Sequence, residues 1–261
     1  MAASLARGVA ASGLGLGVAL AASGGRESPI YAYVAARMVG AFTWLPPEEA
    51  HALTITLAQA GMLPRVPSTP VTGPSIRIRL WGLDFPNPVG LSAGFDKHAE
   101  AMGPLVRCCT ASHNALPYAT TARTDCQTKA IVARVPMQLR LGFGFVEVGG
   151  VTPKPQAGNP KPRVFRLRED GAIINRIGLC SEGHVAVAGR LAEFRTREAA
   201  GKGAVDAPGI ISVNLAKNSD SASAEDDYCA GVRSLGPHVD ILVANVSCPN
   251  VAWTKDLSGN V

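Results

Sequence analysis

The distribution of apolar positions predicts a series of strands from about residue 75 onward. Ile76, Ile78 and Leu80 alternate with arginine and tryptophan, which predicts a strand with one buried face. Four later runs are apolar at nearly every position, which is typical of strands buried on both faces. They occupy residues 88–94, 143–150, 209–214 and 239–245. The pattern therefore predicts a largely buried sheet.

Helices and a hairpin separate these strands. Helical patterns occupy the stretch between Ile177 and Ala207 and, more sharply, Ala224–Leu235. Val164–Leu167 and Ala172–Ile174 flank an Asp-Gly pair, which predicts a β-hairpin. Buried strands that alternate with helices indicate parallel βαβ units. No G-x-G-x-x-G opens a helix and no G-x-x-x-x-G-K-[ST] occurs, so the Rossmann and P-loop folds lose their main support.

The N-terminal region has a different composition. Residues 8–25 contain no charged side chain, and 18 such residues are just long enough to cross a bilayer as a helix. Their glycine and alanine content makes insertion marginal. An acid-free start that contains arginine and serine also suits an organelle transit sequence. A membrane anchor, a removable targeting segment, both in series, and a secretory signal all stay open.

Two short helices are predicted after this segment. The first covers Ala32–Phe42, and the second covers about Pro47–Ala60 with prolines in its first turn. In the second helix one face carries Leu53, Leu57 and Ala60, and Gly61 ends it. A short apolar pair beside a membrane segment suggests an interfacial lid. An ordinary helical hairpin packed on the main domain is an equal alternative.

Composition and charge narrow the function classes. The chain has 261 residues, of which 47% are hydrophobic and 17% charged, so it is globular. Its formal net charge of +5 is spread among acidic residues, which gives nucleic-acid binding no support. The six cysteines form no C-x-x-C pair or disulfide framework. Zinc ligation by Cys108, Cys109, His113 and Cys126 fits no common spacing, so unpaired thiols in a loop are favoured.

The strand ends carry the candidate chemistry. Small residues at 92–94 would let a flat ring lie on the backbone, and Lys97 follows where an ammonium can pair with a carboxylate. Asn175, Asn214 and Asn245 offer amides that both donate and accept hydrogen bonds. Cys248 lies between two amides directly after a strand. Each feature alone has a simpler explanation, a turn asparagine or an inert thiol, but their order at successive strand ends favours a site.

The motifs NPVGLSAGFDKHAEA, LGFGFVEVGGVTPKPQAGNPKPRVFRL, INRIG, VNLAKN, DDYCAGVRSLGP and NVSCPN resemble class 2 dihydroorotate dehydrogenases. The resemblance runs from about Pro29 to Asn250 with one break. It implies a (β/α)8 TIM-type barrel of which about the first four βα units are present. It also implies a targeting or transmembrane segment at 1–26, a helical quinone-tunnel lid at 27–66 and a partial FMN-binding barrel at 75–261.

The resemblance further implies a function and a set of site residues. Dihydroorotate would be oxidised to orotate with FMN, and the electrons would pass to a membrane quinone, as a step of de novo pyrimidine biosynthesis at the mitochondrial inner membrane. Cys248 falls at the position of the catalytic base, and His51 and Arg166 match polar residues of the quinone tunnel. The substrate would be held by Lys97, Asn175, Asn245 and Asn250. The flavin would be lined by Ser92, Ala93, Gly94, Lys97, Gly149, Gly150, Asn175, Asn214 and Asn245. No metal is implied.

Three positions depart from the family pattern. Class 2 members usually carry serine where this chain has Cys248, whereas cysteine is usual in class 1. A thiol has a pKa of about 8.5, so Cys248 is competent as a base and favours alkaline pH. Leu179 replaces a common aromatic residue and Cys180 replaces the usual amide, which weakens the match in the loop over the substrate.

Two longer segments also depart. Residues 106–139 have no clear period, and joining Leu105 to Arg140 would restore a family-like helix and strand. A retained intron or another error in the gene's assigned exons explains this insertion, with a surface loop as the alternative. The sequence ends 11 residues after Asn250, although such a barrel takes about 250 residues by itself. We therefore expect this polypeptide, as written, to hold FMN weakly and not to turn over.

Two other functions compete with this interpretation. The first is a related flavin barrel with another dihydropyrimidine or a soluble acceptor, against which the lid helices and the membrane segment argue. The second is an inactive fragment of the enzyme, whether genuine or the result of wrongly assigned exons, or a membrane-tethered binding protein, which the missing barrel half would support.

Overall fold

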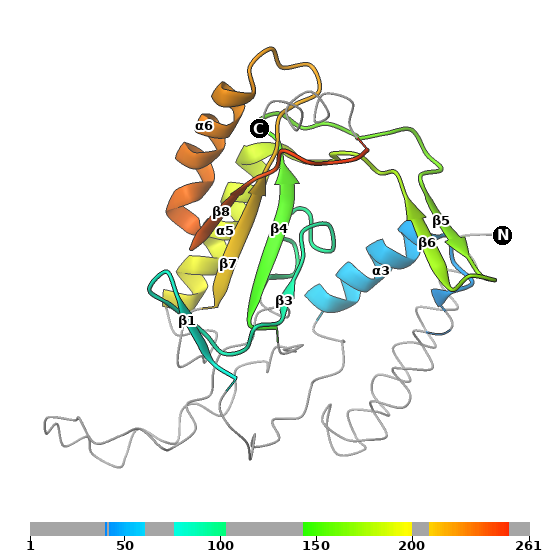
Figure 1. Ribbon diagram of the computed structural model, residues 1–261, viewed down its shortest axis with the longest axis horizontal. Coiled ribbons are helices and arrows are strands. Elements are labelled where there is room, and N and C mark those ends of the chain that lie inside the picture. The colour runs from blue at the N-terminus through cyan, green and yellow to red at the C-terminus, as the bar shows by residue number, and fades with distance from the viewer. Residues whose placement is uncertain (1–39, 41, 61–75, 103–142, 200–208, 251–261) are drawn as a thin grey trace, which may run out of the picture.

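The computed structural model describes residues 40, 42–60, 76–102, 143–199 and 209–250. Its centre is a parallel sheet of four strands whose order in space, β3-β4-β7-β8, follows their order along the chain (Figure 1). These strands are β3 (Gly90–Leu91), β4 (Phe145–Val151), β7 (Ile210–Leu215) and β8 (Ile241–Ala244). All four predicted strands form, although β3 is much shorter than the apolar run that contains it. The predicted burial holds for β4 and β7, whereas β3 is only half-buried and β8 is half-buried with an exposed last residue.

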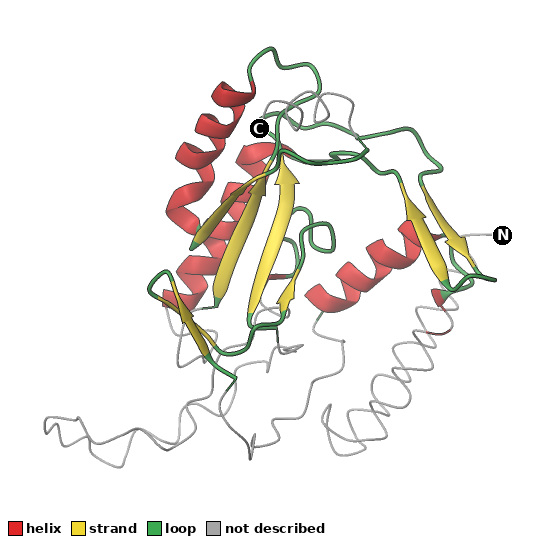
Figure 2. Ribbon diagram, in the orientation of Figure 1, coloured by secondary structure: helices red, strands yellow, loops and turns green. Residues whose placement is uncertain are grey.

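Two helices cover one face of this sheet. Helix α5 (Gly183–Ala199) precedes β7, and α6 (Ala224–Leu235) precedes the short 3-10 helix η3 (Gly236–His238) and β8 (Figure 2). Ser223 caps α6 by accepting the backbone N–H of Asp226 at 3.1 Å, which ends the loop after β7 sharply. Both helices were predicted, and α6 has the predicted bounds. Because the strand order never reverses, the sheet fits part of a TIM-type barrel better than a doubly wound sheet.

The two faces of the sheet differ in chemistry. Val146 and Val148 of β4 and Ile211 and Val213 of β7 belong to the hydrophobic core that includes Leu191 of α5. Residues at alternate positions point to the opposite face. There β4 carries Glu147, opposite Ser212 of β7, and two residues later Gly149 lies opposite Asn214. Apolar packing against the helices fixes the sheet, and its other face is left for polar groups.

Helix α3 (Pro47–Gln59) lies on the other side of β3 from this layer and packs against the hairpin of β5 (Val164–Leu167) and β6 (Ala172–Asn175) (Figure 1). The helix and the hairpin were both predicted. Gly171, with a φ of 60°, closes the hairpin turn, where glycine is favoured because it has no Cβ.

The face that carries Leu53, Leu57 and Ala60 in the sequence is not the face that α3 buries. Ala50, Ile55 and Ala58 are the buried residues of this helix, whereas Leu53 and Leu57 are only half-buried. Ala60, the third residue of the predicted face, is exposed and caps the helix. The two alanines allow this face of the helix to pack closely against the rest of the protein, and the two leucines face partly toward solvent.

The predicted burial of the first strand is wrong. Strand β1 (Ile78–Leu80) forms, but Ile78 and Leu80 are each 45% exposed. Trp81 and Gly82 both have positive φ, and they turn the chain back so that β1 pairs antiparallel with β2 (Leu83–Phe85) only. The alternating pattern therefore identified a strand but not one that joins the buried sheet.

Several predicted segments lie outside the described residues. These are the uncharged run at 8–25, most of the first lid helix at 32–42, and the insertion at 106–139. Within the described ranges, no helix is both long enough and apolar enough to span a bilayer. The division into a segment at 1–26, a lid at 27–66 and a barrel domain at 75–261 stays a prediction.

Candidate active site

A cavity of about 470 Å³ lies between α3, the loop after β3 and the β5–β6 hairpin. His51, Gly94, Lys97 and Asn175 line it, so it brings together four residues that the sequence singled out from segments far apart in the chain. Cys180 lines the same cavity. His51 Nε2 lies 2.6 Å from the backbone oxygen of Phe95, which ties α3 to the loop after β3.

Lys97 is the half-buried cation of this cavity. Burial lowers its pKa, because removing an ammonium from water disfavours its charged form. Cys180, Cys248 and Glu48 raise that pKa, so all three lie within electrostatic range of the lysine. The predicted base, Cys248, follows a different strand and does not line the cavity, but it is within electrostatic range of the predicted substrate lysine.

The loop that carries Lys97 is shaped by a residue that sequence reasoning missed. Asp96 is buried and accepts the backbone N–H groups of Glu100 at 2.7 Å and Ala101 at 2.8 Å. Burial raises its pKa, and these two hydrogen bonds oppose that rise. An aspartate followed by a tight turn is the signal that could have identified it.

Small residues leave the approach to this loop open. Ser92 is exposed, and Ala93 and Gly94 are half-buried. Gly94 has a φ of 104°, and a Cβ built there would meet no atom within 4 Å. The backbone is thus accessible on the side where a flat ring would have to lie.

The amides at the strand ends form a second group of predicted residues. Asn245, directly after β8, donates from Nδ2 to Oδ1 of Asn214 at 2.9 Å. Asn214, on β7, donates from Nδ2 to Oε1 of Glu147 at 2.8 Å. Sequence reasoning missed Glu147, although a carboxylate in a buried strand is unusual enough to signal a role.

Gly149 lies where no larger residue fits, and Gly150 lies where a larger residue would be tightly packed. Gly149 has a φ of 113°, and a Cβ there would lie 2.5 Å from the backbone oxygen of Asn214. A Cβ on Gly150 would lie 3.1 Å from side-chain atoms of Ala216 and Leu179. The two glycines therefore let β4 pass close beside Asn214.

Asn250 and Asn175, the two remaining predicted substrate residues, lie together. Asn250 donates from Nδ2 to the backbone oxygen of Asn175 at 3.1 Å. Asn159, which the sequence did not single out, donates to the backbone oxygens of Asn250 at 3.3 Å and Arg176 at 2.9 Å. Asn175 uses its own Oδ1 to accept the N–H of Ile177 at 2.9 Å.

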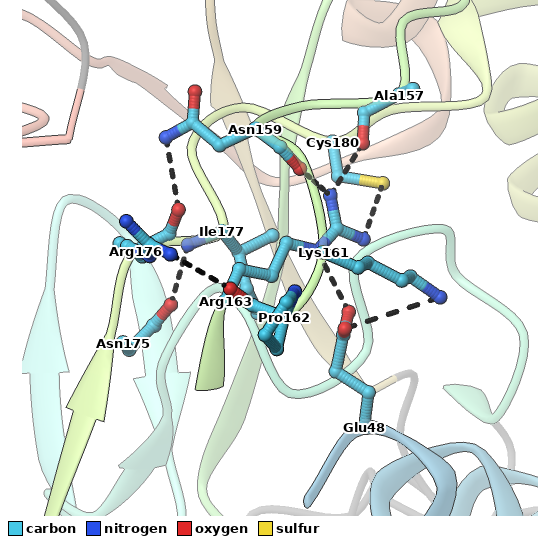
Figure 3. A network of polar contacts seen from close by, with 10 residues as sticks. All are labelled: Glu48, Ala157, Asn159, Lys161, Pro162, Arg163, Asn175, Arg176, Ile177 and Cys180. Atoms are coloured by element: carbon cyan, nitrogen blue, oxygen red, sulfur yellow. Dashed lines mark hydrogen bonds and ion pairs between the residues drawn. The ribbon is translucent and has the colours of Figure 1, made fainter. Parts of the chain in front are cut away.

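Arg163 connects the loop that carries Asn159 to α3 (Figure 3). No sequence pattern predicted this connection. The Nε of Arg163 lies 2.8 Å from Oε1 of Glu48, and its side chain is only 8% exposed. The same guanidinium donates to the backbone oxygens of Ala157 at 2.6 Å and Asn159 at 3.0 Å. Its other end lies 4.0 Å from the Cys180 sulfur. One buried cation thus connects the helix, the loop and the cavity.

Cys180 has an environment that favours its thiolate. A hydrogen bond with the His98 side chain lowers its pKa most, burial opposes this, and Arg163 lowers it further. Lys97 is also within electrostatic range of it. The atypical residue in the loop is therefore a polarised group on the cavity wall.

The two predicted tunnel residues lie apart from each other. His51 lines the cavity. Arg166 does not line it, and its guanidinium donates to the backbone oxygens of Leu45 at 2.5 Å and Thr43 at 3.2 Å. In this way Arg166 fastens the hairpin to the residues before α3, and its role in a tunnel stays a prediction.

Metal chemistry has no candidate ligand cluster in the described ranges, where no three His, Cys, Asp or Glu residues gather to hold an ion. Cys108, Cys109, His113 and Cys126, the weak zinc candidates of the sequence, lie outside the described residues.

The fold and the site define a class: an α/β protein with amides, a lysine and a thiol collected at the carboxyl ends of parallel strands. A sequence model of the family described as dihydroorotate dehydrogenase matches residues 113–261. A dihydroorotate dehydrogenase (quinone) from Xanthobacter autotrophicus is 42% identical over 216 residues, which are 83% of this chain and 49% of the relative. The mitochondrial protein of that name from Mus musculus is 41% identical over 216 residues, 82% of this chain and 45% of the relative.

Solved structures agree with these relatives. The ligand-free dihydroorotate dehydrogenase of Eimeria tenella is similar with a TM-score of 0.61 and 38% identity, over 80% of this chain and 48% of that one. The chain belongs to the dihydroorotate dehydrogenase family. It spans about half the length of the curated relatives it matches.

Proposed function

We propose that the described residues form part of the site in which dihydroorotate is oxidised to orotate, with a flavin as the immediate acceptor and a quinone as the final one. The observation that carries this is the meeting of Lys97 with Cys180 and Asn175 on one cavity wall, and with Cys248 in electrostatic range. These groups come from segments separated in the chain, and their types suit an anionic pyrimidine. The names of the relatives support the same substrate and acceptor.

The residues present fit a flavin. The open backbone at Gly94 leaves room for a flat ring, because a Cβ there would meet no atom within 4 Å. Asn214 and Asn245 retain a second amide proton or lone pair after their mutual hydrogen bond, so they can still bind a heterocycle that both donates and accepts. FMN, the flavin implied by the sequence resemblance, is the form that we propose.

The chain's own residues have separable tasks in this reaction. The bound flavin supplies the redox chemistry by taking a hydride. Lys97 would hold the substrate carboxylate, and Asn175 and Asn250 would orient the ring. Cys248 would take the proton from the carbon next to a carbonyl, and a base for this step must stand within hydrogen-bond reach of that carbon.

The acceptor side is proposed on α3. His51 and Ile55 of this helix line the same cavity as Lys97, so an apolar ring could approach the flavin from there. A membrane quinone, a bilayer and the mitochondrial inner membrane belong to this proposal. The mitochondrial relatives from mouse and rice support them, whereas the bacterial relatives show that the location varies within the family.

Two lysine variants test the proposal in the intact protein, meaning a full-length version that carries the complete barrel. Lys97→Ala should raise the KM for dihydroorotate and lower quinone reduction at least about 100-fold, because a charge-assisted contact and the ring's position are lost together. Lys154→Ala is the matched control, since Lys154 is exposed and follows β4 at the same end of the sheet. Its activity should match the wild type. Equal activity in both variants would contradict the proposed site.

A further inference from the structure

Glu147 is a carboxylate in the middle of β4, a strand whose neighbouring residues are buried valines. It faces away from the helices, opposite Ser212 of β7. A half-buried carboxylate is costly without hydrogen bonds, and Glu147 finds one from Asn214 at 2.8 Å. It therefore belongs to the polar face of the sheet, beneath the strand ends that bear the site.

A carboxylate can only accept hydrogen bonds, and this decides how the amides beyond it are turned. Asn214 must present its Nδ2 group to Glu147, which leaves its Oδ1 toward β8. Asn245 must then present its own Nδ2 group to that oxygen, as it does at 2.9 Å. Without a group that only accepts, Asn214 and Asn245 could turn over together and lose only the exposed hydrogen bond from the Ser247 N–H to Asn245.

The chain of hydrogen bonds continues to the residue before the proposed base. Oδ1 of Asn245 accepts the backbone N–H of Ser247 at 3.2 Å, and Cys248 follows directly. The backbone of Asn245 is held separately, because the Tyr228 hydroxyl donates to its oxygen at 2.7 Å. The Asn245 backbone is thus held by Tyr228, whereas the direction of its amide is set by Glu147 through Asn214 on one side and by the exposed Ser247 N–H on the other.

We infer that Glu147 is a positioning residue for the substrate site: through Asn214 and Asn245 it fixes which amide atoms face the flavin and the pyrimidine, and it steadies the turn that carries Cys248. This inference rests on the proposed function. It adds a residue that touches neither ligand and acts through two that do.

The test replaces the carboxylate by an amide of the same shape in the intact, flavin-loaded protein. Glu147→Gln can both donate and accept, so the orientation of Asn214 and Asn245 is then held only from the other side, by the exposed Ser247 N–H. We expect the dissociation constant of orotate, followed by the visible absorbance of the bound flavin, to rise about tenfold, or ~1.4 kcal/mol. The KM for dihydroorotate should rise by a similar factor.

Glu198→Gln is the control for a purely structural loss. Glu198 is a half-buried glutamate on α5 that pairs with Arg195 at 2.9 Å and accepts the N–H of Gly209, so its loss affects stability away from the site. Both variants should lower the melting temperature, but only Glu147→Gln should weaken orotate binding. Equal orotate affinity in the two variants would overturn the inference.

A double variant that exchanges the carboxylate and the amide keeps the test decisive if Glu147→Gln alone folds poorly. In Glu147→Gln with Asn214→Asp, the glutamine donates to the aspartate, which again can only accept and so fixes Asn245. Orotate affinity should recover at least partly over Asn214→Asp alone, and no recovery would contradict the inference. A wild-type protein with no dihydroorotate-dependent flavin reduction would remove the proposed function, whereas an active wild type with unaffected variants would remove only the role of Glu147.

Discussion

At the scale of single residues, the site depends on charged groups held partly out of water. Lys97, Arg163 and His98 surround Cys180, and the hydrogen bond from His98 is the largest cause of its lowered pKa. Burial has the opposite effect on the same thiol. Such an arrangement shifts thiol reactivity to lower pH, because the thiolate is the nucleophile.

Cys180 should therefore be alkylated by iodoacetamide at a pH below the range of an ordinary thiol. His98→Ala should raise its pKa and slow labelling severalfold near neutral pH, since the thiolate loses its hydrogen bond. Mass spectrometry of the labelled peptide gives the rate, and Cys180→Ser identifies the peptide. An unchanged pH profile in the His98 variant would contradict the prediction.

The lowered pKa of Lys97 should make the unfolding free energy of the protein rise with pH in the alkaline range. Burial lowers its folded pKa, so between that value and about 10.4 the unfolded chain holds a proton that the folded chain has released. Raising the pH through this window therefore favours the folded state. The unfolding free energy of the wild type, relative to that of Lys97→Met, should increase between about pH 7 and about pH 10. Urea unfolding measures it, and parallel pH curves for the two proteins would count against it.

At the scale of elements, α3 is held to the rest of the protein by polar contacts over a limited apolar area. Glu48 and Arg163 form the most buried of these contacts, with 25% and 8% of their side chains exposed. Lys161 also approaches Glu48, at 3.9 Å (Figure 3). This pair should decide how firmly the helix closes the cavity.

A double-mutant cycle with Glu48→Gln and Arg163→Lys should give a coupling energy of about 1–3 kcal/mol in urea unfolding. Arg79 and Asp84 provide the control, because they are 3.8 Å apart with 76% and 77% of their side chains exposed. The cycle Arg79→Lys with Asp84→Asn should give a coupling of roughly 0–1 kcal/mol. Similar couplings in both cycles would show that burial does not strengthen the first pair.

Gly149 should tolerate substitution poorly because its conformation and its neighbours both require glycine. Gly149→Ala should cost about 3 kcal/mol, since its Cβ would lie 2.5 Å from the Asn214 backbone oxygen at positive φ. Gly171→Ala has positive φ but open space around it, and should cost only ~1–2 kcal/mol. Thermal unfolding of the two variants compares them, and equal losses would argue against close packing at Gly149.

Most elements could be predicted from the sequence, because apolar periodicity is a local signal. The strand at 209–214, the hairpin around Asp170-Gly171 and the helix Ala224–Leu235 all follow from it. Burial could not be predicted as well. Strand β1 is exposed, and α3 buries Ala50 and Ala58, because what covers an element is set by distant segments.

The same reason limited prediction of the site. Lys97, Asn214 and Cys248 lie in recognisable motifs at strand ends, so the sequence could nominate them. Arg163 and Glu48 are 115 positions apart, and neither segment has a sequence pattern that predicts contact with the other. Glu147 could not be nominated from the sequence, because its role depends on the hydrogen bond that it accepts from Asn214 of β7. Only the register between β4 and β7 shows that these two residues meet.

At the scale of the whole molecule, the described part combines a sheet that has one apolar and one polar face with a cavity lined by α3, the loop after β3 and the β5–β6 hairpin. Relatives at about 40% identity are named for the oxidation of dihydroorotate with a quinone. The molecule thus combines a rigid layer that fixes the amides with a separate element through which an acceptor could enter.

Anaerobic reduction of the bound flavin tests the central claim most directly, because it isolates the first half-reaction from the quinone. Adding dihydroorotate to the intact protein should bleach the visible flavin absorbance within a single turnover. Cys248→Ala should slow this step about 10²–10⁴-fold, the usual contribution of a positioned base. A flavin that stays oxidised in the wild type, or bleaches equally fast without Cys248, would contradict the account.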